Sequence, residues 1–496
     1  MPNSSYDVVI LGNGLGSLIT AALCARRGLR TLHLAPDDVQ ERYLLGPHRL
    51  PLEPMLWPSR MAWAGERVLK ELSLELALRR KLREPRVSAQ VVAPDLRFEL
   101  GDSMAKELAR ELGTERGEQW TSEWQTLAEL GRPLDAVMTG EQLFPHSGFL
   151  RRETAKVVDK AGVDAEQAWR GVTSPILPSL AKAIAALWMR HPEPPPVAVG
   201  RALDACRGGL LPLRGDAEAL RELVLEKLTG AGGEARVGKV RELTTSWGKI
   251  SSVIVGNEEI GAGQVVAAIP PREVAALLGK KAPKKLGELG ESTRVVGYRY
   301  TINIVLDAAG VPDAMAPTVF VLDDPARPPC NDNAFSVHCG EPDDSGHVVV
   351  SLAAVLATQG PIDDEVLRGR SQELRVALLT KLDDVMPFYD RHVVVGHSPY
   401  DGLPPSTPSG PGTYEAPKGM PLPMRPVMSG ELADTAGTGA LAYPSPFKNL
   451  TFTGGQILPQ LGLEGELCAA WNAARIAAGI AGKKRDFLRD EVVAGS

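Results

Sequence analysis

The sequence predicts an α/β fold, α+β overall, in which a parallel sheet with crossover helices is interleaved with a second unit of sheet plus helices. Three observations predict this architecture. The chain opens with a strand, a glycine-rich turn, a helix and a second strand; strand and helix patterns alternate again after residue 200; and a late strand is followed by an Ala-rich helix. Because 496 residues are many for one core, we expect two interleaved domains.

Composition places the chain in the ordinary soluble globular class, at 44% hydrophobic and 23% charged residues. A net charge of -6 without a basic tract gives no reason to expect nucleic acid as a partner. The five scattered cysteines lack CxxC spacing, so neither a zinc site nor a disulfide framework is expected. With no signal segment and no transmembrane run in the sequence, a cytoplasmic location is expected.

The first unit covers Tyr6 to Asp38, YDVVILGNGLGSLITAALCARRGLRTLHLAPDD. A buried strand precedes a glycine turn, and a helix then runs to Gly28. In the turn, Gly12 allows a sharp bend and Gly14 allows close approach of a pyrophosphate to the helix N-terminus. Leu15 and Gly16 follow, and the small Ser17 holds the third motif position. This order predicts a Rossmann-type dinucleotide-binding unit; the alternative is a tight turn of another α/β fold.

The end of the second strand lacks the acid that usually binds the ribose hydroxyls, because Ala35 and Pro36 stand there. Losing a charged hydrogen bond worth about 1.5–3 kcal/mol weakens binding by one to two decades. Asp37 and Asp38 are most simply solvated turn residues. His33, one residue earlier in the strand than Leu34, is expected to be a packed, hydrogen-bonded histidine.

The middle of the chain divides at the proline-rich HPEPPP, which ends with Pro196. From about Glu53 to His191 the pattern predicts a mainly helical region, clearest at 105–112, 118–130 and 176–189. After the prolines we expect the following elements: a helix at 216–228, strands at 234–243, 250–255, 264–268, 294–307 and 348–356, a helix at 363–385 and an irregular segment at 401–428.

The C-terminal run KNLTFTGGQILPQLGLEGELCAAWNAARIAAGIAG begins at Lys448. A strand, a turn at Gly454 and Gly455, and a helix starting near Leu463 would direct backbone N–H groups and a helix dipole at one point. This arrangement suits the pyrimidine edge of a flavin, where negative charge develops on reduction. The alternative is an ordinary capped helix, with Glu464 and Glu466 favouring its positive end.

Taken together, the first unit and the C-terminal run resemble the flavoprotein superfamily that includes phytoene desaturases, amine oxidases and Rab GDP-dissociation inhibitors. The segments RGGLLPLRGDAEAL, GGEARVGKVRELTTSWGKISSVIV and VVAAIPP are similar to its second nucleotide-binding segment. PYDGLP and NLTFTGGQ…LPQLGLEGE resemble bacterial phytoene-dehydrogenase-like proteins. The resemblance implies an FAD-binding domain of the glutathione-reductase/GDI type from 1–52, 200–290 and 440–496, and a substrate or partner domain from 53–199 and 291–439.

The resemblance also implies which residues line the FAD site. In this sequence they are Gly12, Gly14, Leu15, Gly16, Ser17, Val240, Gly455, Gln456, Leu463 and Glu464. The chain departs from the family pattern at three points. Ala35 replaces the ribose-binding acid, APDDVQERYLLG lacks the Gly-Gly-Arg turn, and Gln456 stands where many relatives have Asp.

A second resemblance is narrower. YDVVILGNGL together with LHL is similar to the opening of Rab GDP-dissociation inhibitors, which bind no flavin and hold a prenylated GTPase. The leading hypothesis is therefore an FAD-dependent oxidoreductase that transfers a hydride from an apolar or amine-bearing molecule to flavin. The alternative is a cofactor-free fold that binds a partner protein or lipid, which leaves peripheral membrane contact open.

Catalytic and metal-binding residues are not identified from the sequence. It contains no nucleophile elbow, and its eight histidines show no metal spacing. A substrate tunnel could be walled by the apolar helix at 176–189 together with Met55, Leu56, Trp57 and Trp63. Packing of these residues in a helical core is the simpler interpretation.

Overall fold

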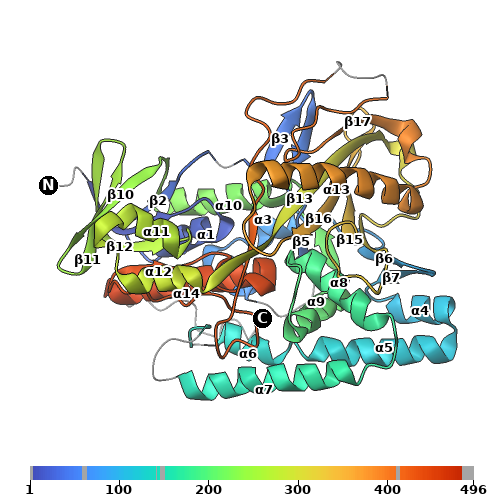
Figure 1. Cartoon of the computed structure of the whole chain (residues 1–496), viewed down its shortest axis with the longest axis horizontal. Helices are drawn as coiled ribbons and strands as arrows, with labels where there is room; N and C mark the ends of the chain where they lie inside the picture. Colours follow the sequence, from blue (N-terminus) through green and yellow to red (C-terminus); the bar gives the residue numbers. More distant parts are fainter. Residues whose placement is uncertain are drawn as a thin grey trace.

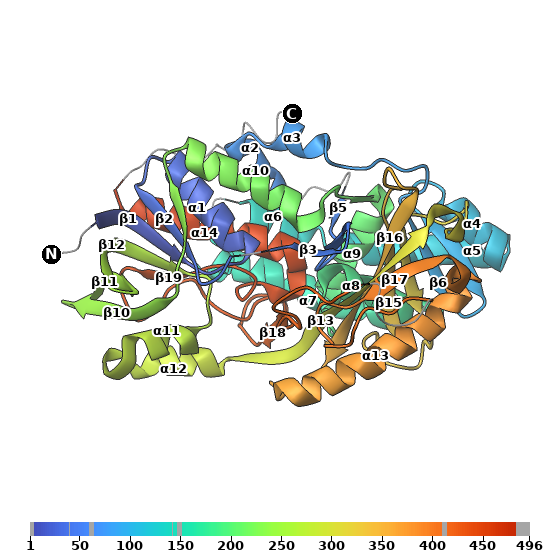
Figure 2. The same cartoon turned by 90° about the horizontal axis from the view of Figure 1, so that it is seen from above.

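A computed structural model of the chain describes residues 4–38, 40–58, 64–140, 142–145, 151–408 and 414–482. The described residues form two large sheets placed side by side, with a group of helices below the second (Figures 1 and 2). The mixed α/β class with a Rossmann-like parallel sheet and a separate second sheet is confirmed. No helix among these residues is long and apolar enough to cross a membrane.

The seven-stranded sheet draws its strands from distant parts of the chain, in the order β10-β11-β12-β1-β2-β9, with β19 also paired to β12. Its strands are β1 (Ser4–Leu11), β2 (Thr31–Ala35), β9 (Glu234–Val237), β10 (Val240–Ser246), β11 (Lys249–Val255), β12 (Glu258–Ala267) and β19 (Leu450–Phe452). The pairs β1–β2, β1–β12, β2–β9 and β12–β19 are parallel. Their carboxyl ends therefore meet at one edge of the sheet.

The glycine turn follows β1 and leads into α1 (Leu15–Arg26), as the sequence predicts. Helix α1 packs against α10 (Asp216–Gly230) and α14 (Gly462–Ile480). The single strand expected at 234–243 is wrong. It is two strands that pair with different neighbours, β9 with β2 and β10 with β11, and the chain passes from one to the other after Gly238, whose N–H still donates to the Ala35 carbonyl (2.8 Å).

The eight-stranded sheet has the order β17-β13-β16-β15-β14-β6-β7, with β18 also paired to β13. Its strands are β6 (Ala89–Ala93), β7 (Leu96–Leu100), β13 (Thr293–Asp307), β14 (Thr318–Leu322), β15 (Ala334–Cys339), β16 (His347–Ala357), β17 (Val393–His397) and β18 (Pro426–Gly430). Helix α13 (Asp364–Val385) covers one face of this sheet (Figure 2). The long strands and the helix expected in this region are present.

Strands β6 and β7 correct the expectation of a mainly helical segment between Glu53 and His191. They form a hairpin, and β6 joins the second sheet beside β14. The rest of that segment and its continuation contain α2 (Gly65–Leu72), α3 (Glu75–Arg79), α4 (Met104–Leu112), α5 (Thr114–Glu129), α6 (Pro133–Thr139), α7 (Arg151–Arg170), α8 (Leu177–Met189) and α9 (Pro196–Gly208). Pro196 opens α9, where its missing N–H costs nothing.

One hairpin, one antiparallel pair of strands distant in sequence, and two α-helices complete the described strands and α-helices. They are β3 (Arg42–Leu45) with β4 (His48–Pro51), β5 (Leu56–Pro58) with β8 (Leu210–Pro212), α11 (Pro271–Leu278) and α12 (Lys284–Glu291). One apolar core extends from the seven-stranded sheet through the helices to Phe320 and Leu322 in the second sheet. The two sheets are thus joined by continuous packing.

Candidate ligand-binding site

A cavity of about 350 Å³ lies between the two sheets. Its wall includes the glycine turn, the segment between β19 and α14, the last turn of α8 and strands of the second sheet. The main lining residues are Asn13, Gly14, Leu15, Glu41, Glu53, Met55, Leu56, Leu187, Trp188, Met189, Arg190, Arg299, Tyr300, Thr301, Phe320, Ser336, His338, Arg425, Met428, Gly455, Gln456, Leu463 and Glu466. One side of the cavity is apolar and the other carries charge.

The glycine turn has the geometry that its sequence predicts. Gly12 has a φ of +134°, and a Cβ there would lie 2.9 Å from the Cβ of Ala268. The Ser17 hydroxyl donates to the Gly14 carbonyl (2.6 Å) and lies 3.0 Å from Nε2 of His33. Burial, together with the charge of Arg221, lowers the pKa of His33 to about 4. His33 is therefore the packed, hydrogen-bonded histidine that was expected.

A carboxylate of the protein itself, that of Glu466, lies at the N-terminus of α1. The N–H of Gly16 donates to Oε1 of Glu466 (2.7 Å), and a Cβ at Gly16 would lie 2.7 Å from Cγ of that glutamate. Glycine at position 16 thus lets α14 place a carboxylate against the first turn of α1. A carboxylate is stabilised there by the helix dipole. Glu466 stabilises the start of the neighbouring helix α1. The sequence suggested instead that it favours the start of its own helix, α14.

Glu464 lies away from the cavity, in contrast to the prediction that it binds cofactor. Its two oxygens accept hydrogen bonds from Arg201 (both 2.6 Å), and Oε1 also accepts one from the N–H of Ala64 (3.1 Å). The Glu464 side chain is only 1% exposed and that of Arg201 only 2%. The helical period separates these roles, because Leu463 and Glu466 share the cavity-facing side of α14 and Glu464 does not.

A chain of ion pairs crosses the charged side of the cavity. Glu41 and Glu53 stand at the two ends of the β3–β4 hairpin. Arg425 contacts Glu41 (2.6 Å) and, more distantly, Glu53 (3.8 Å), while Arg299 (3.2 Å) and Arg190 also contact Glu53. Burial alone would raise the pKa of Glu53, but these guanidinium groups hold that pKa at about 2. Glu53 is therefore ionised at neutral pH.

Three polar atoms at this wall have no hydrogen-bond partner among the described residues. They are Oε1 of Glu53, Nε of Arg299 and Oγ1 of Thr301. Each is buried, and each belongs to a cavity-lining residue. Leaving a buried polar atom unpaired costs about 1–3 kcal/mol.

Gln456 has a structural reason to replace the Asp of many relatives. Its side-chain N–H₂ group lies within hydrogen-bond distance of three carbonyls, those of Ala267 (3.2 Å), Ile269 (3.1 Å) and Thr453 (3.1 Å). An ionised Asp cannot donate to any of them. The amide therefore ties the end of β12 to the end of β19.

Apart from Glu464, the predicted FAD-site residues lie in three places. Those that line the cavity are Gly14, Leu15, Gly455, Gln456 and Leu463. Gly12, Gly16 and Ser17 build the turn behind it, and Val240 begins β10, close to the position where β9 pairs with Ala35. Of the residues proposed as a tunnel wall, Met55 and Leu56 line the cavity, Trp57 is buried, and Trp63 lies outside the described residues.

No pattern in the sequence indicated the charged residues of the wall. Arg299, Arg425 and His338 come from the second sheet and its neighbouring segment, and no local motif marks them. Burial and the charge of Arg190 lower the pKa of His338 to about 3, so it is neutral at pH 7. The spacing of three residues places Glu466 on the same helix face as Leu463, but it does not show that Glu466 contacts Gly16.

FAD fits this site only at one end. Gly455, Gln456 and Leu463 leave room beside the start of α14, where a flavin ring would lie. The diphosphate would instead meet the Glu466 carboxylate on the Gly16 N–H, with Glu41 on the same cavity wall. Ala35 offers no acceptor side chain to the ribose. The described residues therefore do not fit FAD held as a dinucleotide along this turn.

No protein-family model matches the sequence, and no curated protein matches it. Solved structures do. A putrescine oxidase variant has a TM-score of 0.62 at 15% identity over 97% of this chain and 100% of that one. An oxidoreductase from Methanosarcina mazei has a TM-score of 0.58 at 14% identity over 94% and 99%. Rab GDI from Plasmodium falciparum has a TM-score of 0.51 at 10% identity over 96% and 98%.

These likenesses define the class of fold. It is the fold of the FAD-dependent amine oxidases, which Rab GDI shares. This chain has that fold over nearly its whole length. The resemblance seen in the sequence is therefore confirmed for the fold. Because the identities are low, the likeness shows the fold alone.

Proposed function

We propose that this chain is a binding protein that holds an apolar organic molecule with a polar end in its central cavity, without FAD. The observation that carries the proposal is the hydrogen bond from the Gly16 N–H to Glu466. It places a permanent part of the chain where a dinucleotide would put its diphosphate. The proposal shares the absence of FAD with the alternative from the sequence, which expected a partner protein or a lipid as the ligand.

Electrostatics supports this interpretation. Two like charges 4 Å apart repel by about 4 kcal/mol at an effective dielectric constant near 20, which is about three decades of affinity. Glu466 meets the start of α1 without the entropy loss of a free ligand, since it is part of α14. A diphosphate would have to displace it and then remain close to its charge.

The cavity wall indicates the chemistry of the ligand. Leu187, Trp188 and Phe320 offer apolar surface for its body. Oε1 of Glu53 accepts no hydrogen bond among the described residues and lies 3.8 Å from Nε of Arg425; it offers an acceptor for a hydroxyl or a protonated amine. Nε of Arg299, which also has no hydrogen-bond partner among them, offers a donor for an oxygen. The ligand class is therefore an apolar molecule whose polar end carries both functions.

A flavin-dependent oxidoreductase acting on an apolar or amine-bearing molecule is the second candidate. It is favoured by the five predicted residues that line the cavity and by the open space above Gly455, where a Cβ would meet nothing within 4 Å. The structural likeness to putrescine oxidase is in accord with it.

Flavin occupancy distinguishes the two candidates. We expect purified protein to be colourless and to show no saturable FAD binding in titration calorimetry. Glu466→Ala should show saturable FAD binding that the unchanged chain lacks, because the diphosphate regains the Gly16 N–H. Glu431→Ala, at an exposed acid outside the cavity, is the matched control and should bind like the unchanged chain. Purified protein carrying about one FAD per chain would overturn the proposal and establish the oxidoreductase.

A further inference from the structure

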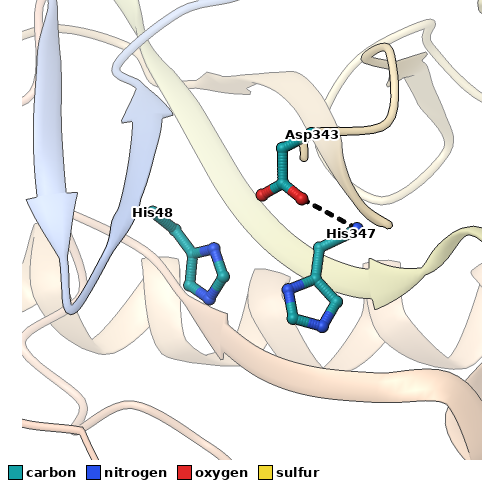
Figure 3. Close-up of side chains that lie close together, drawn as sticks. All are labelled: His48, Asp343 and His347. Carbon is teal, nitrogen blue, oxygen red and sulfur yellow. Dashed lines mark hydrogen bonds between the residues drawn. The ribbon is translucent and has the colours of Figure 1, made fainter. Parts of the chain in front are cut away.

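Three potential metal ligands converge at the outer end of the second sheet (Figure 3). His48 begins β4, His347 begins β16, and Asp343 lies in the turn before β16. One ligand atom from each lies within 4.8 Å of the other two. The imidazole rings of the two histidines have centroids 5.4 Å apart at an interplanar angle of 66°. The cluster is separate from the central cavity, because none of its three residues lines that cavity.

The carboxylate of Asp343 is fixed by its own turn. Its Oδ1 accepts hydrogen bonds from the backbone N–H groups of Ser345 (2.9 Å) and His347 (3.0 Å), the second of which Figure 3 shows. These bonds hold the carboxylate beside the two rings. Its position is therefore set before any ion binds.

Each imidazole has an outer partner for one of its nitrogens. Nε2 of His48 lies 3.4 Å from the hydroxyl of Tyr414, and Nε2 of His347 lies 3.5 Å from Oδ1 of Asp307. Such outer contacts orient a metal-binding histidine and raise its basicity. Nδ1 of His347 is buried and has no hydrogen-bond partner among the described residues. That atom is left facing the cluster with an unused lone pair or proton.

We propose that His48, Asp343 and His347 form a binding site for a divalent zinc-type cation, with water completing a tetrahedron. Two imidazoles and one carboxylate are a donor set that zinc prefers. In such a tetrahedron, ligand atoms about 2.0–2.2 Å from the metal are about 3.3 Å from one another. The ligand atoms lie within 4.8 Å of one another, so binding requires the histidine side chains to move closer to the fixed carboxylate.

An ion bound at this site would link the β3–β4 hairpin to the second sheet, because His48 lies on β4 and His347 on β16. The hairpin already meets the sheet through a small apolar cluster that includes Tyr43 and Val305, and through hydrogen bonds from Asn303 to Tyr43 (3.2 Å) and to the Pro51 carbonyl (2.8 Å). Its two ends carry Glu41 and Glu53, which line the central cavity. An ion bound at its tip would therefore stabilise the segment that supports the charged wall.

The metal content of the protein tests the proposal directly. Full-length protein is incubated with zinc chloride, desalted and analysed by inductively coupled plasma mass spectrometry, with binding measured in parallel by titration calorimetry. We expect about one zinc per chain, and at least a tenfold weaker affinity for His347→Gln and for Asp343→Ala. Asp344→Ala removes the adjacent exposed carboxylate and should bind like the unchanged chain.

Thermal unfolding provides a second measurement. Zinc should raise the melting temperature of the unchanged chain and of Asp344→Ala, and leave that of His347→Gln unmoved. The glutamine retains nearly the size of the ring, which favours a folded variant. Failure of the unchanged chain to bind zinc, or equal binding by His347→Gln, would overturn the proposal.

Discussion

The carboxylate of Glu466 accepts a 2.7 Å hydrogen bond from the backbone N–H of Gly16, which joins the start of α14 to the start of α1. Both helices begin at the carboxyl edge of the seven-stranded sheet, where ligands of open α/β folds bind. The contact therefore combines two effects at one place. It stabilises the junction of the helices and occupies the anion position of the glycine turn.

Replacement of Glu466 by Gln tests the first of these effects. The amide oxygen can still accept from Gly16, but the charge–dipole attraction is lost. We expect the free energy of unfolding to fall by about 0.5–1 kcal/mol, since a charge at a helix N-terminus is worth about that much. Urea unfolding followed by circular dichroism measures the change. No loss of stability would show that the carboxylate charge contributes nothing at this position.

Gly12→Ala should destabilise the chain strongly. The residue has a φ of +134°, and its Cβ would lie 2.9 Å from that of Ala268. We expect a loss of about 2 kcal/mol or more, from backbone strain and from the clash. Gly28→Ala is the matched control: Gly28 also has a positive φ, of +75°, but its Cβ would meet nothing within 4 Å. Equal losses in the two variants would rule out the clash as the main cause.

Arg201→Met should be among the most damaging single changes. It leaves the carboxylate of Glu464 buried without its guanidinium partner, and breaking a buried pair costs about 3–5 kcal/mol. The comparison is Arg170→Met, which removes a contact to Glu166 where the two side chains are 81% and 64% exposed, and should cost less than about 1 kcal/mol. Denaturant midpoints of the two variants give the difference. Similar midpoints would contradict a structural role for the buried pair.

Acid should weaken the fold through Glu53. Its pKa in the folded chain is about 2, below the ordinary 4.5, so the folded state binds this proton less readily than the unfolded chain does. The resulting stabilisation, about 3 kcal/mol, is complete above pH 4.5 and is lost as the pH falls towards 2. Unfolding free energies between pH 5 and 3 should therefore drop less steeply in Glu53→Gln than in the unchanged chain. Parallel pH profiles would show that Glu53 is not the group responsible.

Much of the fold could be predicted because its signals are local. The β1–turn–α1–β2 unit depends on residues close together in sequence, and Gly12 marks the bend by itself. Two errors also have local causes. The alternation of Leu96, Phe98 and Leu100 was a strand signal that the helical pattern around it obscured, and Gly238 marked the break between β9 and β10.

The site itself could be predicted only in part. The motifs placed Gly14, Gly455 and Leu463 on what proved to be one cavity wall. They could not show that Glu466 turns towards Gly16 while Glu464 turns towards Arg201, because the direction of a side chain depends on which neighbours its helix packs against.

What the amino-acid order alone established is the class of fold and the position of its glycine turn, since both follow from periodicity and backbone freedom over a few residues. The tertiary structure decided which distant residues come together: Glu466 with Gly16, and His48 with His347. These partners are hundreds of residues apart, and no local pattern encodes a contact that forms only when two sheets and their helices close on one another.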